Sequence, residues 1–141
     1  MKSKRIILDT NLWISFLISK NHMEIDQLIK TEKVVLIFSN ELLEEFIEVV
    51  KRPKFKKFFA KKDVEKLLNM FDQFADLINI TSKSKICRDE KDDFLLNLAI
   101  DGNADYLVTG DKDLLILKKV NKTKILTYSE LLEILLKTNI S

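Results

Sequence analysis

The sequence predicts an α/β fold with a mainly parallel central sheet, and three observations support this class. Short apolar runs alternate along the chain with longer segments of helical periodicity, as in folds built from right-handed strand–helix–strand crossovers. The runs are apolar at nearly every position, which is typical of strands covered on both faces. The chain has 141 residues, of which 46% are hydrophobic, and this fits a single domain over residues 1–141.

The first half of the chain contains two predicted strands. Residues 5–8 and 33–38 are short apolar runs rich in β-branched side chains, which favour strands. Residues 12–18 are apolar with helical spacing, and residues 25–29 carry a weaker helical signal. Residues 41–50 are amphipathic, which predicts a helix.

The second half of the chain continues this alternation. Residues 64–75 have apolar side chains at helical spacing, and residues 77–80 are expected to form a further strand. The remaining elements are expected in the order helix, strand, strand and helix, over residues 94–100, 105–108, 124–126 and 129–136. Parallel strands bring their carboxyl ends to one edge of the sheet, where the functional crevice of such folds lies.

The composition excludes several kinds of site. Two Gly and one Pro are too few for a glycine-rich phosphate loop or a dinucleotide-binding fingerprint. The sequence has one cysteine, Cys87, and one histidine, His22, which excludes an internal disulfide, a multi-cysteine zinc site and a histidine-rich metal site. Any chemistry therefore depends on carboxylates, hydroxyls, amides and lysines.

The sequence has no pattern of a secreted or membrane protein. The apolar run Ile6-Ile7-Leu8 before Asp9 is far too short for a signal peptide, and no apolar run approaches the roughly 20 residues of a membrane span. We therefore expect a soluble, cytoplasmic protein with no membrane partner.

Basic residues gather in one stretch although the net charge is only +2. The stretch contains Lys51, Arg52, Lys54, Lys56, Lys57, Lys61 and Lys62. One interpretation is that these side chains contact the phosphate backbone of RNA without reading its sequence, because all but one are lysines. The other is that they solvate a helix whose phenylalanines, Phe55, Phe58 and Phe59, face the core.

Polar residues follow the predicted strands at their carboxyl ends. They are Asp9-Thr10-Asn11, Ser39-Asn40 and Thr109-Gly110-Asp111-Lys112-Asp113. Asp9 ends a strand expected to be central, and its partial desolvation there favours a functional role over that of a helix N-cap. One of Asp111 and Asp113 is expected to cap the short segment 112–117, but two acids so close together exceed what a cap needs.

The predicted helix over residues 41–50 has one glutamate near its apolar stripe. At about 100° per residue, Glu45 lies within about 40° of the edge of that stripe. Glu41, Glu44 and Glu48 lie further from it. Glu45 is therefore the candidate to lean into the crevice, and the alternative is that all four glutamates form a solvated face.

Two neighbouring acids precede the apolar helix over residues 94–100. On the helical wheel Asp92 falls within the apolar arc, whereas Asp93 shares a narrow polar face with Asn97 and Asp101. We therefore expect Asp92 to point inward and Asp93 outward. The alternative for Asp92 is a structural role in a capping box with Asp89.

Several acids at one sheet edge repel one another unless a cation lies between them. A site made of oxygen ligands selects a hard ion such as Mg²⁺ or Mn²⁺. Such an ion activates a water molecule and offsets charge on phosphoryl oxygens, so these residues predict hydrolysis of a phosphate ester.

The stretches that carry these residues also follow the order of a known family. They cover residues 7–11, 39–45, 52–55, 88–92 and 104–114. In them the sequence resembles the PIN-domain nucleases, and among these the toxins of prokaryotic toxin–antitoxin pairs. The resemblance implies a three-layer α/β/α domain and a metal-dependent endoribonuclease. It assigns Asp9, Glu45, Asp92 and Asp111 as catalytic and metal-binding acids, Asp113 as an auxiliary ligand, and Thr10, Asn11, Ser39 and Thr109 as supporting polar residues.

The resemblance also implies partners, namely an RNA substrate, an antitoxin protein and a second copy of the chain in a homodimer. The sequence departs from the family's pattern at Glu90 and Tyr128, where relatives often have Pro, and these departures concern loop shape. A different class of function stays open, in which the chain is a catalytically idle PIN-fold module that binds RNA or protein. A haloacid-dehalogenase-like phosphatase is disfavoured because Asn11 stands where it needs a second aspartate.

Overall fold

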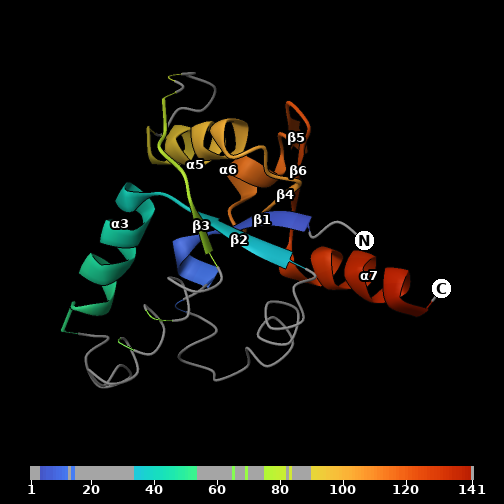
Figure 1. Cartoon of the computed structure of the whole chain (residues 1–141), viewed down its shortest axis with the longest axis horizontal. Coiled ribbons are helices and arrows are strands. Elements are labelled where there is room, and N and C mark those ends of the chain that lie inside the picture. The colour runs from blue at the N-terminus through green and yellow to red at the C-terminus, as the bar shows by residue number, and fades with distance from the viewer. Residues whose placement is uncertain are drawn as a thin grey trace.

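In the computed structural model of the chain, residues 4–12, 14, 34–53, 65, 69, 75–81, 83 and 90–140 are described, and the side chains of 75, 90–92 and 136–140 are outside this description. A six-stranded sheet crosses the middle of the described part, with α5 and α6 on one side and α7 on the other (Figure 1). This arrangement confirms the predicted α/β class.

The sheet is parallel except at one edge. Its order is β3-β2-β1-β4-β6-β5, with β1 (Lys4–Leu8) inside. The parallel neighbours are β2 (Val34–Phe38), β3 (Ala75–Leu77), β4 (Tyr106–Val108) and β6 (Thr123–Leu126). The edge strand β5 (Lys119–Val120) is antiparallel to β6. It was not predicted, because two residues beginning with a lysine make no apolar run.

The helices agree in type with the sequence predictions and differ at their ends. They are α3 (Asn40–Val50), α5 (Glu90–Asp101), α6 (Lys112–Leu115) and α7 (Tyr128–Ile140). Residues 10–12 and 14 are also helical, whereas the prediction over 25–29 and most of that over 64–75 lie outside the described residues. No helix in the described ranges is long and apolar enough to cross a membrane.

The strand predicted at residues 77–80 is displaced toward the amino terminus. β3 pairs with β2 through Leu36 and Ala75 at one end and Phe38 and Leu77 at the other. The Ile78 N–H still donates to the Phe38 carbonyl at 2.7 Å, but β2 ends there. The pairing of β3 with β2 therefore ends with this hydrogen bond, and the local sequence pattern does not reveal that end.

The core is formed by the sheet and the helices that cover it. Ile6, Ile7 and Leu8 of β1 are almost completely buried, as expected for a strand with a helix layer on each face. Leu42 and Phe46 of α3 are buried with them. The apolar stripe predicted for residues 41–50 is thus the face of α3 that packs on the core.

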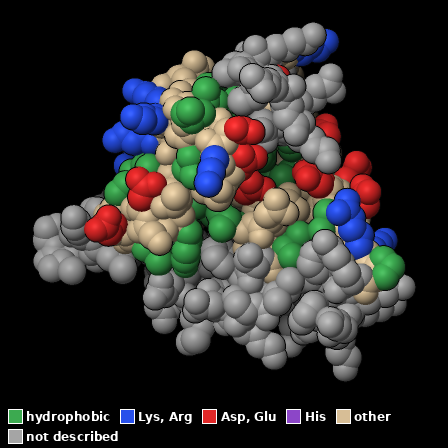
Figure 2. Space-filling view, turned by 180° about the vertical axis from the view of Figure 1, so that it is seen from behind, with side chains coloured by type: hydrophobic (Ala, Val, Ile, Leu, Met, Phe, Trp, Pro, Cys, Tyr) green, Lys and Arg blue, Asp and Glu red, His purple; other side chains and the backbone are tan. Residues whose placement is uncertain are grey.

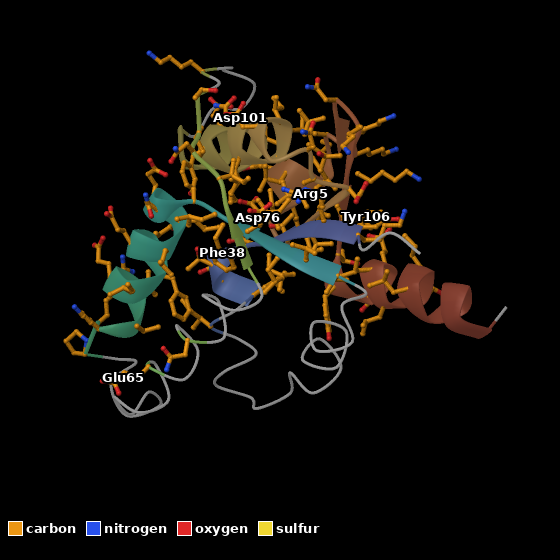
Figure 3. The ribbon with its side chains drawn as sticks, in the orientation of Figure 1. Arg5, Phe38, Glu65, Asp76, Asp101 and Tyr106 are labelled. Atoms are coloured by element: carbon orange, nitrogen blue, oxygen red, sulfur yellow. The ribbon has the colours of Figure 1, made fainter. Side chains whose placement is uncertain are left out.

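The end of α5 approaches β2 closely at Gly102. A methyl group at this position would lie 2.9 Å from Ile37 Cγ2 and 3.0 Å from the Leu98 carbonyl oxygen. Arg5 completes this contact, because its Nε donates to the Gly102 carbonyl oxygen at 2.8 Å and its Nη2 to Asp76 Oδ2 at 2.9 Å (Figure 3). One side chain therefore ties β1 to β3 and to the end of α5.

We predict that Gly102→Ala lowers the free energy of unfolding by about 1–3 kcal/mol, because the added methyl group forces apart two elements that are already in contact. Urea denaturation measures this change. The matched control is Gly110→Ala, where a methyl group meets nothing within 4 Å. Equal stability of both variants would contradict the close packing of α5 on β2.

Candidate active site

The pairing of β1 with β4 brings two chain segments together at the carboxyl edge of the sheet. Leu8 pairs with Val108 in the parallel register, and the Asp9 N–H donates to the Val108 carbonyl oxygen at 3.0 Å. Asp9 and Thr109 therefore leave neighbouring strands side by side. The prediction that the first strand is central and that Asp9 ends it is confirmed.

Thr109 links Asp9 to the segment that contains Asp111. Its hydroxyl oxygen lies 2.8 Å from Asp9 Oδ2 and accepts the Asp111 N–H at 3.0 Å. Because Asp9 Oδ2 is an acceptor, the single hydroxyl proton points to it. The Thr109 side chain is completely buried, so this geometry is held by the surrounding core.

Asp9 also has the capping role that was weighed against function. Its Oδ1 accepts the Asn11 N–H at 3.3 Å, and its carbonyl oxygen accepts the Leu12 N–H at 3.0 Å. A carboxylate offers about four lone-pair positions, so the two hydrogen bonds that this carboxylate accepts, from the Asn11 N–H and the Thr109 hydroxyl, leave capacity for a cation. Thr10 is buried beside Asp9, whereas Asn11 is exposed.

Asp111 is the N-cap of α6. Its Oδ1 accepts the Asp113 N–H at 2.9 Å, which confirms that one of these two acids caps the segment. The side chain of Asp113 is exposed in the first turn. Neither Asp9 nor Asp111 forms a salt bridge with any basic residue that the structure describes.

Two predicted site residues belong to α3 and its N-cap. Ser39 has a structural role, and Glu45 is a candidate metal ligand. Ser39 is buried and caps α3, because its Oγ accepts the Leu42 N–H at 3.1 Å. Glu45 is partly buried, whereas Glu41, Glu44 and Glu48 are exposed. The expected difference in exposure is therefore present, and a metal-binding role for Glu45 stays a prediction.

The prediction that Asp93 points outward is wrong. Asp93 is only 8% exposed and Asn97 only 7% exposed, in a helix whose Leu96 and Leu98 are also buried. A helix that is apolar almost all round is covered over most of its circumference, and here the cover includes the polar face at Asp93 and Asn97. That apolar circumference was a signal in the sequence for the burial of Asp93.

Asp93 lies near the carboxyl edge by topology. α5 is followed by a short turn and then by β4, so its first turn is at the end of the sheet where β4 finishes. Asp93 is therefore a further candidate residue, which the sequence analysis missed. The side chain of Asp92 is outside the described residues, and its inward orientation stays a prediction.

The donor set matches a hard divalent cation in kind, because it consists of carboxylate oxygens. Figure 2 shows Asp and Glu side chains gathered near the middle of one face of the molecule. Among the side chains that the structure describes, no three of His, Cys, Asp or Glu lie close enough to hold an ion together. The acids of the predicted set whose side chains are described do not complete a metal centre by themselves.

The predicted basic stretch is described only at its start. Lys51 and Arg52 are exposed after the end of α3. Lys54, Lys56, Lys57, Lys61 and Lys62 lie outside the described residues, and so do Phe55, Phe58 and Phe59. Both interpretations of this stretch stay open.

Comparison with known proteins identifies the family. The sequence model of a family described as the PIN domain matches residues 5–113, which include Asp9, Thr109 and Asp111. The chain belongs to the PIN domain family. The resemblance noted from the sequence is thereby confirmed.

Two individual relatives extend this comparison. The PIN domain chain is 35% identical over 121 residues to the uncharacterized protein MJ1680 of Methanocaldococcus jannaschii, covering 84% of this chain and 77% of the relative. A solved structure of the PIN domain endonuclease Utp24 superposes with a TM-score of 0.52 at 18% identity, covering 86% of this chain and 82% of that one. The second likeness supports the fold.

We predict that Thr109→Val destabilises this PIN domain by about 1–3 kcal/mol, because it removes the acceptor of the Asp111 N–H and the donor to Asp9 while keeping the shape of the side chain. Urea denaturation measures the loss. Thr109→Ser is the matched control because it retains the hydroxyl. If the valine variant were as stable as the serine variant, the hydrogen bonds of Thr109 would not hold this edge together.

Proposed function

We propose that this PIN domain is a metal-dependent endoribonuclease that hydrolyses phosphodiester bonds in RNA. The observation that supports it most is the buried Thr109 hydroxyl, which joins the Asp9 carboxylate to the Asp111 backbone at the carboxyl edge. A binding module has no need for two acids at this edge that have no basic partner among the described residues. The structural relative that is called an endonuclease is consistent with nuclease activity in the same fold.

The proposed acids are Asp9, Glu45, Asp92 and Asp111, with Asp113 as an auxiliary ligand and Asp93 as the addition from the structure. Bound Mg²⁺ or Mn²⁺ supplies a water molecule of lowered pKa and offsets negative charge on the phosphoryl oxygens. Thr109 orients the Asp9 carboxylate by its hydrogen bond, and Asn11 holds the other oxygen of the same group. Such second contacts fix a ligand before the ion arrives.

The biological role that we propose is that of a toxin in a toxin–antitoxin pair in the cytoplasm. Its partners are then an RNA substrate, an antitoxin protein and a second copy of the chain. Controlled expression in a bacterial host tests this role, because the wild type should arrest growth and Asp9→Asn should not. Growth arrest by both forms would contradict a role that depends on cleavage.

The proposed activity predicts that wild-type protein cleaves structured RNAs in Mg²⁺ or Mn²⁺ and not in chelator. Asp9→Asn should lower the single-turnover rate by more than roughly 100-fold, the upper end for residues that only orient a ligand. Denaturing gels of a panel of RNAs measure both effects. If the wild type binds RNA but cuts none of the panel with either ion, the idle-module alternative replaces this proposal.

A second set of variants tests which acids belong to the site. Glu45→Gln should lower cleavage strongly, whereas Glu48→Gln, an identical change on the exposed side of the same helix, should leave it near the wild-type rate. Asp92→Asn and Asp93→Asn should be compared in the same assay, with thermal melting as a control for folding. We expect loss of cleavage from both of them, and wild-type cleavage by Asp93→Asn would limit that residue to a structural role.

A further inference from the structure

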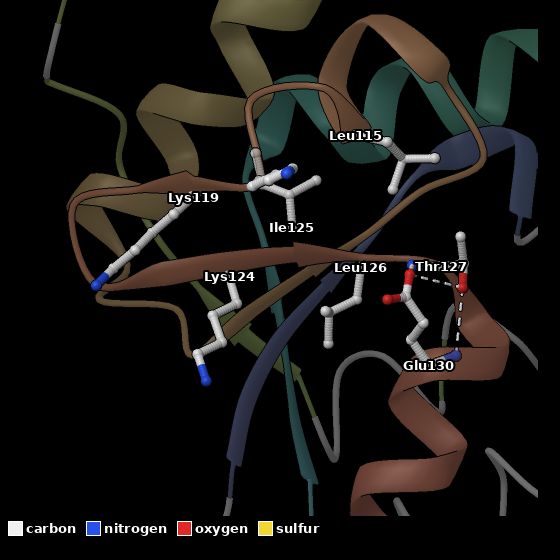
Figure 4. Close-up of a pocket in the computed structure, with 8 residues that line it drawn as sticks. Leu115, Lys119, Lys124, Ile125, Leu126, Thr127 and Glu130 are labelled. Atoms are coloured by element: carbon white, nitrogen blue, oxygen red, sulfur yellow. Dashed lines mark hydrogen bonds between the residues drawn. The ribbon is translucent and has the colours of Figure 1, made fainter.

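A basic hollow lies between α6 and the β5–β6 hairpin (Figure 4). Its volume is about 500 Å³, and it is lined by Leu115, Lys118, Lys119, Lys124, Ile125, Leu126, Thr127 and Glu130. None of the seven basic residues singled out in the sequence belongs to it. The hollow combines cationic side chains with an apolar wall, and neither has a role in the site described above.

The hollow is lined by three lysines and one acid, Glu130. Lys118, Lys119 and Lys124 have no acidic partner among the residues that the structure describes. Lys119 and Lys124 are moreover directly opposite one another in the β5–β6 ladder. Like charges at opposed positions destabilise a sheet, so repulsion between these two lysines lowers the stability of this edge. A bound anion would offset that repulsion.

The acid at the rim of the hollow is already engaged. Glu130 Oε1 accepts the Thr127 N–H and the Thr127 hydroxyl, both at 3.0 Å, and Thr127 Oγ1 accepts the Glu130 N–H at 3.2 Å. This reciprocal pair is a capping box at the start of α7. The carboxylate thus serves the first turn of the helix, where backbone N–H groups favour negative charge.

The hollow is continuous with the carboxyl edge that carries Asp9 and Asp111. β6 is parallel to β4, and the Thr109 N–H donates to the Leu126 carbonyl oxygen at 3.0 Å. From Thr127, at this edge, the hollow extends back along β6 to Lys124, a distance of about 10 Å at about 3.3 Å per residue. A polymer bound in the hollow would therefore pass beside the acids.

We propose that this hollow binds the RNA strand next to the bond that is cut. Lys118, Lys119 and Lys124 contact successive phosphates, and Leu115 and Leu126 pack against a ribose or base. The inference rests on the proposed nuclease function, since it assigns the substrate path of that site. RNA is favoured over an acidic protein segment because the hollow leads to the carboxyl edge, which a substrate must reach and a protein ligand need not.

The test measures binding without cleavage. A short fluorescein-labelled oligouridine is titrated with the full chain in EDTA at several salt concentrations, and anisotropy reports the affinity. Lys119→Gln with Lys124→Gln should weaken binding roughly tenfold and reduce the slope of log affinity against log salt by about 1.4, which corresponds to two lost contacts on a single strand. Lys119→Arg with Lys124→Arg should retain the wild-type slope.

A matched control distinguishes the loss of lysines in the hollow from a general loss of positive charge. Lys4→Gln with Lys83→Gln removes the same charge from two exposed lysines, one at the amino end of β1 and one after β3, the strand at the opposite edge. It should bind like the wild type. Equal weakening by both double variants, no weakening by either, or no RNA binding by the wild type would each overturn the proposal.

Stability and a second ligand provide independent readouts. Lys124→Gln alone should raise the melting temperature, because it removes the repulsion with Lys119, while it weakens RNA binding.

A poly-glutamate peptide is the second probe. If the lysine variants lost the peptide but kept RNA, the hollow would be a protein-binding site. Cleavage is not part of these assays, so absence of nuclease activity with intact binding would refute the proposed function and leave the hollow as an RNA site.

Discussion

The register between β1 and β4 is the constraint on which the candidate site depends. Their hydrogen-bonded pairing ends at Leu8 and Val108, and the next residue of each strand carries a polar side chain. Side chains alternate between the two faces of a strand, so a slip by one residue would turn Asp9 away from Thr109 and move Ile6 and Ile7 to the opposite faces of the sheet, where they would have to pack against other partners. The burial of the β1 residues and the position of the acid are therefore set by the same pairing.

The acids at the two edges of the sheet, where the strands begin and where they end, differ in their partners. At the amino edge, Asp105 accepts the Arg5 N–H at 2.8 Å and lies 4.0 Å from Lys122. At the carboxyl edge, Asp9 and Asp111 are held by a hydroxyl and by backbone N–H groups, with no cationic partner among the described residues. One end is arranged for stability. The other has negative charge in excess, which is a typical condition for binding a cation.

The hollow beside β6 complements this arrangement. Its lysines have an excess of positive charge for the same reason that Asp9 and Asp111 have an excess of negative charge, since neither set is paired within the described structure. The segments that carry the two sets are neighbours, because the Thr109 N–H donates to the Leu126 carbonyl oxygen at 3.0 Å. A phosphodiester polymer can satisfy both, because its phosphates bind lysines directly and bind carboxylates through a cation.

The fold class, the strands that end at polar residues, the capping of α6 by Asp111 or Asp113 and the lower exposure of Glu45 could all be predicted from the amino-acid sequence. These features depend on periodicity and on nearest neighbours along the chain, which a sequence displays directly. The folded chain was needed to establish that Asp93 is buried, that β3 stops at Leu77 and that Lys119 faces Lys124. Each of these depends on which distant element covers a helix face or ends beside a strand. The apolar circumference of the helix was a sign of the first, whereas the end of β3 and the pairing of the two lysines leave no periodic trace in their own segments.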